Sequence, residues 1–213
     1  MDFIKLMAEI VDGLGITLLI FAVTLAASIP LGFLGSKLSL SKHAGLRGVW
    51  GTFVYIMRGT PLILQVLFLY FGLGFLGLGI PRELSAIISF IMNYTAYYSE
   101  IFRGGMQSVN RGQYEAASVL GLSKSVTSRR IIIPQVFKIV MPSLGNEVIN
   151  LVKDTALVSI IAIADITKNA NSAAMREGTI APFIVAMIFY LGITAVLTLV
   201  LKKIEKRMDY YRF

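Results

Sequence analysis

Long uncharged runs of apolar residues constrain this chain more than any other feature. Three of them span Gly13–Ser36, Gly59–Pro81 and Thr179–Leu201. Each has the roughly 20 residues that a helix needs to cross the hydrocarbon core of a bilayer. Two further runs cover Leu84–Ser99, which could extend through Gly104, and Ile139–Ala164, which is interrupted by charges. Because lipid cannot hydrogen-bond backbone groups, these runs must be helices.

Composition supports the same fold class. The chain is 56% hydrophobic with a mean hydropathy of +0.75, well above a soluble domain. We therefore predict an all-α, polytopic membrane protein with five transmembrane helices in one domain, residues 1–213.

The positive charges indicate how the helices are oriented. Fourteen Lys and Arg residues fall on one side of the predicted spans and four on the other. Cytoplasmic loops carry the excess of Lys and Arg. This predicts an outside amino terminus and a cytoplasmic carboxyl terminus, with residues 105–134 in the cytoplasm.

Several function classes lack support in the sequence. The net charge of +8 comes from loops beside the predicted spans, so we expect contact with lipid headgroups and no nucleic acid. Cysteine is absent and His43 is the only histidine, which leaves no metal-ligand or catalytic cluster. The sequence also contains no G-x-x-x-x-G-K-[ST] phosphate loop, so we expect no catalytic residue and no cofactor in this chain.

Polar residues recur at helical spacing within the predicted third span. Asn93, Tyr97, Glu100 and Gly104 lie at i, i+4, i+7 and i+11. Charged residues within a membrane are expensive and call for a reason. A water-filled substrate path is one explanation. Pairing of Glu100 with Arg103, one turn along the same helix, is another.

The predicted fourth span has a second polar face. Glu147, Asn150 and Asp154 lie at i, i+3 and i+7. Glu100 and Asp154 together could hold a positively charged substrate group. The alternative is structural, since intramembrane charges also pair with each other or extend to an interface.

The sequence predicts a break in a helix at Arg58-Gly59-Thr60-Pro61, with Gln65 one turn later. Proline removes a backbone donor, and interrupted helices at membrane depth expose groups that can bind substrate. Arg58 could hold an α-carboxylate or a structural carboxylate partner. Pro61 could also simply begin a helix after a short turn.

The segment Glu115–Pro134 is polar and basic, between apolar runs. Asn110 or Gly112 could begin a short helix, Gly121 suits its left-handed end, and Ser123 can cap a second helix. This predicts a compact helix–bend–helix projection. The alternative is an ordinary amphipathic loop.

The spacing of Glu115-Ala116-Ala117, Gly121 and Ile131-Ile132-Ile133-Pro134 resembles the EAA motif of ABC importer permeases, with Ile133 where Leu is usual. Further matches are Arg58-Gly59-Thr60-Pro61, Tyr98–Gly105 and Lys153-Asp154-Thr155, the last followed by Ala156 where Ser is common. Over nearly its whole length the chain resembles the polar amino-acid importers for histidine, glutamine, glutamate and arginine.

That resemblance implies a MetI-like type I importer permease with five membrane helices, in a prokaryotic cell membrane. It implies that an ATPase grips the projection through Glu115, Ala116, Ala117, Leu120 and Gly121. Implied partners are two ATPase subunits, which carry ATP and Mg, a second or homologous permease, and an external substrate-binding protein.

The substrate remains open between two groups. Acidic residues on two helices favour arginine, lysine or histidine, whereas Arg58 and Lys153 could serve glutamine or glutamate. The substrate path is predicted to include Arg58, Thr60, Gln65, Asn93, Tyr97, Glu100, Asn150 and Asp154. A secondary transporter is the rival class, but it would usually show an inverted repeat.

Overall fold

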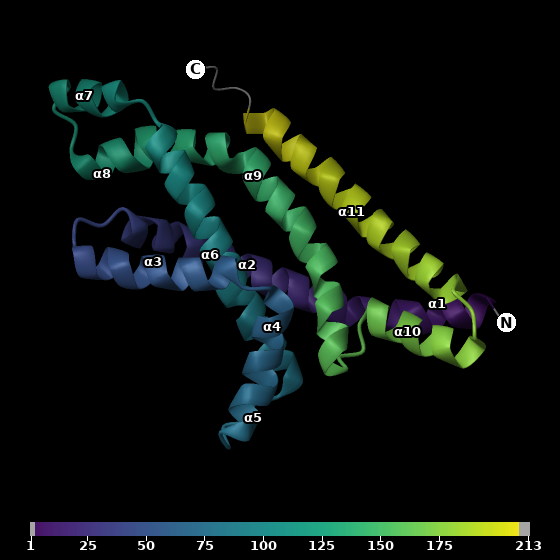
Figure 1. Cartoon of the computed structure of the whole chain (residues 1–213). Coiled ribbons are helices and arrows are strands. Elements are labelled where there is room, and N and C mark those ends of the chain that lie inside the picture. The colour runs from purple at the N-terminus through teal and green to yellow at the C-terminus, as the bar shows by residue number, and fades with distance from the viewer. Residues whose placement is uncertain (1–2, 209–213) are drawn as a thin grey trace.

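The computed structural model describes residues 3–208, and these contain helices but no strand (Figure 1). The α-helices are α1 (Phe3–Asp12), α2 (Leu14–Ser39), α3 (Ala44–Gly59), α4 (Leu62–Leu67), α5 (Leu73–Phe75), α6 (Arg82–Ser108), α7 (Arg111–Val119), α8 (Lys124–Val126), α9 (Ile133–Asp154), α10 (Ile166–Glu177) and α11 (Ala181–Met208). π-helical turns cover Phe68–Gly72 and Thr127–Ile132, and a 3₁₀ turn covers Thr155–Ile161.

Helix α6 forms the centre of the main core. Its side chains Phe90, Tyr94, Tyr98 and Phe102 recur every fourth residue and are fully or almost fully buried. They face α2 on one side and α9 on the other. A Cβ atom on Gly32 of α2 would lie 2.5 Å from the Cβ atom of Tyr98. The missing side chain therefore lets α2 and α6 approach closely, as small residues do between membrane helices.

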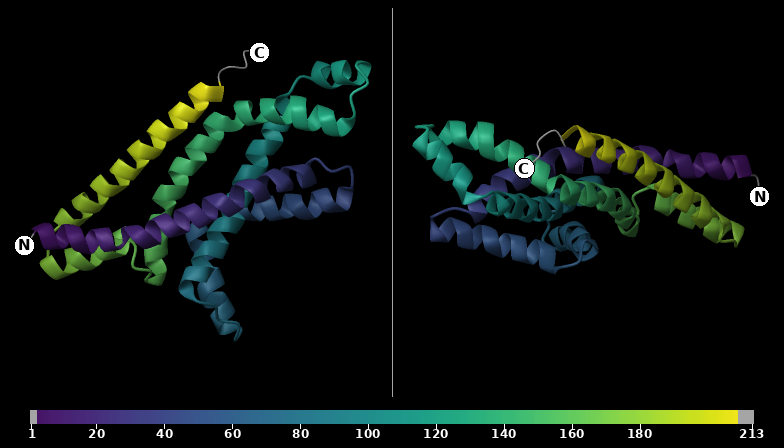
Figure 2. Two further views of the ribbon diagram at one scale, coloured as in Figure 1. Left: turned by 180° about the vertical axis from the view of Figure 1, so that it is seen from behind. Right: turned by 90° about the horizontal axis from the view of Figure 1, so that it is seen from above.

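A second, smaller core joins α1, α10 and α11, which meet at the amino-terminal end of the molecule (Figure 2). Ile10, Ile166 and Ala170 are fully buried there. At the surface, Arg176 Nη2 of α10 donates to Glu9 Oε2 of α1 over 2.7 Å, and Asn169 donates to the Glu9 carbonyl. These contacts fix the short helix α10 against α1.

The chain bends sharply between α3 and α4, where the two segments meet at 106°. Thr60 is extended, and Pro61 has φ −62° and ψ 133°, so neither continues the helix. The predicted break is confirmed. The apolar run Gly59–Pro81 does not coincide with the helical segment, because helix begins before the bend, at Ala44, and ends at Phe75.

Other boundaries also differ from the apolar runs. Helix α9 begins at Ile133 instead of Ile139, and regular helix ends at Asp154 before a 3₁₀ turn. Helix α6 continues through Gly104 to Ser108. Charged ends of helices do not interrupt backbone hydrogen bonding, so apolar runs understate helix length.

Two helical stretches of the described residues are long and apolar enough to cross a membrane, Ile4–Ser39 and Ala181–Met208. The bent pair of α3 and α4–α5 would be a third if it is one span. Helices α6 and α9 have 27 and 22 residues, which is sufficient length. Their polar faces lower their hydropathy because much of each helix contacts protein, so five spans stays a prediction.

Candidate functional site

The segment α7–α8 projects from one end of the molecule, beyond α6 and α9 (Figure 1). Local hydrogen bonds shape it. Asn110 Oδ1 accepts from the Gly112 amide over 2.8 Å, and Ser123 Oγ accepts from the Val126 amide. Gly121 has φ +69°, and the Leu122 amide donates to the Ala117 carbonyl. This is a Schellman ending, so the predicted helix–bend–helix projection is confirmed.

The projection exposes apolar side chains. Val119 is 88% exposed and Leu120 is 75% exposed. Of the residues predicted to couple to an ATPase, Glu115, Ala116, Leu120 and Gly121 are exposed, whereas Ala117 is buried. Ala117 therefore packs the projection internally. The other four are available to a partner protein.

Arg58, Glu100 and Arg103 form one charged cluster. Arg103 Nε and Nη2 donate to the two carboxylate oxygens of Glu100 over 2.9 and 2.7 Å. Arg58 Nη1 lies 3.6 Å from Glu100 Oε2, and its guanidinium lies 5.3 Å from the ring centroid of Tyr97. The charge of Glu100 is thus already compensated by two cations. A cavity of about 420 Å³ beside it is lined by Gly51, Tyr55, Arg58 and Glu100.

Thr60, Gln65 and Asn93 form a second group, which we call the bend clasp. Gln65 Nε2 donates to the Met57 carbonyl, the Thr60 carbonyl and Thr60 Oγ1. Asn93 Nδ2 donates to the Met57 carbonyl and to Gln65 Oε1. These bonds satisfy carbonyl groups that the break in the helix leaves without partners. The three predicted path residues therefore hold the α3–α4 bend to α6.

Asp154 belongs to a third group, between α6 and α9. Tyr94 Oη donates to Asp154 Oδ2 over 2.7 Å. Glu147 lies one turn before Asn150 on α9, and Asp154 and Arg58 are the charges that act on it. Tyr98 Oη is buried with no hydrogen-bond partner among the described residues. Within these residues, neither Glu147 nor Asp154 has a cation within ion-pair distance, in contrast to Glu100.

The structure therefore divides the predicted path into three groups. Glu100 and Asp154, which we expected to act together, make separate contacts, and Arg58 is the charge that acts on both groups. Sequence reasoning did not select Tyr94 and Tyr98 as site residues. They are spaced every fourth residue with Phe90 and Phe102, as on a helix face that packs in the core. Tyr94 follows Asn93 directly, which turns it about 100° round the helix toward α9.

Comparison with known proteins places this geometry in context. Residues 14–210 match the family described as binding-protein-dependent transport system inner membrane component. The chain is 33% identical over 201 residues to the arginine transport system permease protein ArtQ of Bacillus subtilis, covering 93% of this chain and 92% of the relative. It is also 33% identical over 207 residues to the glutamine transport system permease protein GlnP of Escherichia coli K12, with the same coverage.

Solved structures show the same fold. A crystal structure of an amino acid ABC transporter with histidines superposes with a TM-score of 0.90 at 31% identity, covering 97% of both chains. An inward-facing MetNI methionine ABC transporter superposes with a TM-score of 0.75 at 14% identity, covering 96% of this chain and 98% of the other. The bend, the central helix α6 and the projection are thus parts of one known permease fold.

Proposed function

Because the chain belongs to the binding-protein-dependent inner membrane transport components, as a polar amino-acid ABC importer permease, we propose that it forms the membrane path for a cationic amino acid. It is a transporter component and not itself an enzyme. Such permeases work in complexes with ATPase and binding-protein partners. Two ATPase subunits that carry ATP and Mg, and a second permease, complete the importer that we propose.

The proposed arrangement has five spans. The pair α1–α2, the bent unit α3–α5 and helices α6, α9 and α11 each cross the membrane. The projection α7–α8 then lies in the cytoplasm with the carboxyl terminus. Its exposed Val119 and Leu120 provide an apolar surface for the ATPase. ATP-driven closure of the ATPases would move this projection and, through α6 and α9, the path itself.

One observation supports a cationic substrate. Among the described residues, Glu147 and Asp154 of α9 have no cation within ion-pair distance, although Arg58 and Lys153 act on them from further away. Glu147 and Asp154 lie beside buried Tyr94 and Tyr98, between α6 and α9. Carboxylates in such surroundings are costly unless paired. The guanidinium, ammonium or imidazolium group of arginine, lysine or histidine would supply the missing charge. Arg103 already holds both oxygens of Glu100, so Arg58, partly exposed beside the 420 Å³ cavity, can exchange its longer contact with Glu100 for the α-carboxylate.

Glutamine or glutamate is the second candidate. The similarity to GlnP favours it, and Arg58 and Lys153 provide positive charge near the same cavity and helix. In that case Glu147 and Asp154 would be structural. The two candidate substrates predict different effects on stimulated ATP hydrolysis when the α9 charges are removed.

The test uses the complete importer in proteoliposomes. Substrate-stimulated ATP hydrolysis is measured against arginine, lysine, histidine, glutamine and glutamate separately. Asp154→Asn and Glu147→Gln each remove one charge at nearly constant shape. Glu83→Gln removes the same charge from the exposed start of α6 and is the matched control. We expect the two α9 variants to raise the half-saturating arginine concentration about tenfold or more, and the control to have no effect.

Three results would contradict parts of the proposal. Stimulation by glutamine or glutamate alone would keep the importer and overturn its cationic substrate. Normal arginine stimulation in both α9 variants would remove Glu147 and Asp154 from the path. If the chain fails to associate with any ATPase, the proposed coupling through α7–α8 is wrong.

A further inference from the structure

A basic cavity of about 440 Å³ lies between α9 and α11, near the end of the molecule that carries the projection. Lys138, Lys202 and Lys206 line it together with Glu205, so three ammonium groups meet one carboxylate. Lys202 and Lys206 are exposed, and Glu205 is half-buried. Glu205 Oε1 would lie 3.7 Å from a Cβ atom on Gly145, which places its carboxylate against the wall formed by α9.

The same face of α11 continues from the cavity as an exposed apolar stripe. Residues at i, i+4, i+7, i+15, i+18 and i+22 share one face of a helix. In α11 these positions are occupied by Ile184, Ile188, Leu191, Leu199, Lys202 and Lys206. The four apolar members are between 47% and 70% exposed. This face is therefore apolar along its length and cationic at its end.

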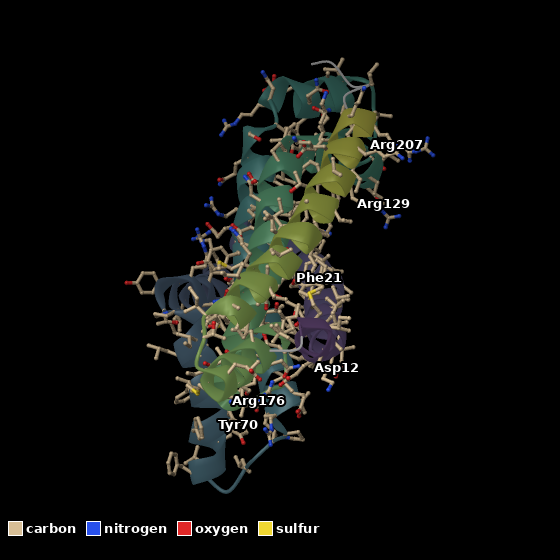
Figure 3. The ribbon with its side chains drawn as sticks, turned by 90° about the vertical axis from the view of Figure 1, so that its right-hand side faces the viewer. Asp12, Phe21, Tyr70, Arg129, Arg176 and Arg207 are labelled. Carbon is tan, nitrogen blue, oxygen red and sulfur yellow. The ribbon has the colours of Figure 1, made fainter. Side chains whose placement is uncertain are left out.

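The part of this face from Leu191 to Lys202 is long enough for the acyl chains of one leaflet of a bilayer. Lys202 follows Leu191 by eleven positions. At about 1.5 Å per residue they span roughly 16 Å. Half of a hydrocarbon core of about 30 Å is a similar length. Arg129 and Arg207 lie toward the same end of the molecule, and Arg176 lies at the opposite end (Figure 3).

We propose that the cavity binds the phosphate of an anionic phospholipid, with the acyl chains along the stripe. Lys202 and Lys206 hold the phosphate, and Met141 at the cavity wall contacts the adjoining glycerol. Basic pockets between membrane helices suit anionic headgroups. Free phosphate has the same charged group, but it would make no use of the apolar stripe. The proposal is independent of which amino acid the importer carries.

The test compares two charge-matched double variants in the complete, detergent-purified importer. Lys202→Ala with Lys206→Ala removes two charges from the cavity. Lys203→Ala with Arg207→Ala removes two charges from neighbouring positions that do not line it. Native mass spectrometry measures binding of phosphatidylglycerol and of phosphatidylcholine with the same chains. We expect the cavity variant to bind phosphatidylglycerol roughly thirtyfold more weakly and the control to be within about twofold of the parent.

A third variant separates charge from packing. Lys202→Arg with Lys206→Arg keeps both cations and should retain phosphatidylglycerol. Equal loss in the cavity and control variants would overturn the site and leave only a generally basic surface. Unchanged binding in the cavity variant would overturn it as well. If millimolar inorganic phosphate displaces the lipid from the parent protein, free phosphate and not a phospholipid is the ligand of the cavity.

Discussion

At the scale of single residues, close packing between α2 and α6 depends on Gly32. A Cβ atom there would lie 2.5 Å from Tyr98 Cβ and 3.0 Å from the Ser99 amide nitrogen. We expect Gly32→Ala to lower the stability of the protein by about 1–3 kcal/mol, because neither backbone can yield without separating the helices. The midpoint of thermal unfolding in detergent measures this.

Gly15 supplies the matched control on the same helix. A Cβ atom there would meet nothing within 4 Å. Gly15→Ala should therefore leave the midpoint unchanged or raise it, since alanine favours a helix by about 0.5–1 kcal/mol over glycine. Equal destabilisation by the two substitutions would show that contact with Tyr98 does not determine the effect, because helix propensity favours alanine at both positions.

Residue patterns predicted the local structure better than the contacts between helices. The caps at Asn110 and Ser123 and the left-handed Gly121 were predictable because each depends on neighbours in the chain. The hydrogen bond from Tyr94 to Asp154 was not, because it depends on how α6 and α9 rotate against each other. The pairing of Glu100 with Arg103 was foreseen as an alternative from its spacing of three residues.

At the scale of elements, the bend clasp makes the break between α3 and α4 a defined structure. Gln65→Glu keeps the shape of the side chain but removes the amide that donates to Met57 and Thr60. At pH 8, where a free carboxylate is ionised, we expect a loss of about 1–3 kcal/mol and faster proteolysis at residues 60–61. Thermal unfolding and limited proteolysis measure the two effects.

Gln107→Glu is the corresponding control. Arg103 Nη1 donates to Gln107 Oε1 over 2.6 Å, and a carboxylate would accept the same bond. This substitution should therefore cost no stability. If Gln65→Glu were equally harmless, the clasp would not be what holds the bend.

The sequence located the bend but not the length of the helical unit around it. Apolar runs mark the parts of helices that face lipid. Helix α3 contains Arg47 and Arg58 and is anchored to α6 by a hydrogen bond from Trp50 Nε1 to Ser99 Oγ. Its position therefore depends on packing and not on hydropathy. Helices α6 and α9 also pack against protein, which lowers their mean hydropathy. Composition alone therefore does not identify them as membrane spans.

The left-handed turn at Gly121, within the projection α7–α8, leads to a separate prediction about coupling to the ATPase. Gly121 has φ +69°, and a Cβ atom there would meet nothing within 4 Å, so only backbone strain opposes a side chain. Valine should be disfavoured by about 1–2 kcal/mol or more in this conformation, whereas asparagine tolerates it. We expect Gly121→Val to insert into the membrane but to lose substrate-stimulated ATP hydrolysis in the complete importer.

Gly121→Asn distinguishes backbone strain from loss of glycine itself. It should retain most of the stimulated activity, because Asn adopts the left-handed conformation more readily than other side chains. Normal coupling in Gly121→Val would mean that the shape of α7–α8 is not what the ATPase requires.

At the scale of the whole molecule, the cysteine-free sequence permits a direct test of topology. Single cysteines can be placed without background labelling. Ser125 and Lys203 are exposed near the basic end, and Leu78 and Met175 are exposed in other parts of the chain. If five spans cross the membrane, an impermeant maleimide added outside intact cells should label Leu78→Cys and Met175→Cys only.

The pattern across all four positions tests whether α6, α9 and α11 each cross the membrane. Ser125→Cys and Lys203→Cys should react only after the membrane is permeabilised, because the charge-based orientation places both in the cytoplasm. The two crossings of α9 and α11 between them return the chain to the same side. Labelling of Ser125→Cys from outside would reverse the charge-based orientation. Opposite behaviour of Ser125→Cys and Lys203→Cys would mean that α9 and α11 do not both cross. The projection and the basic cavity would then face different compartments, although the helices pack together within one fold.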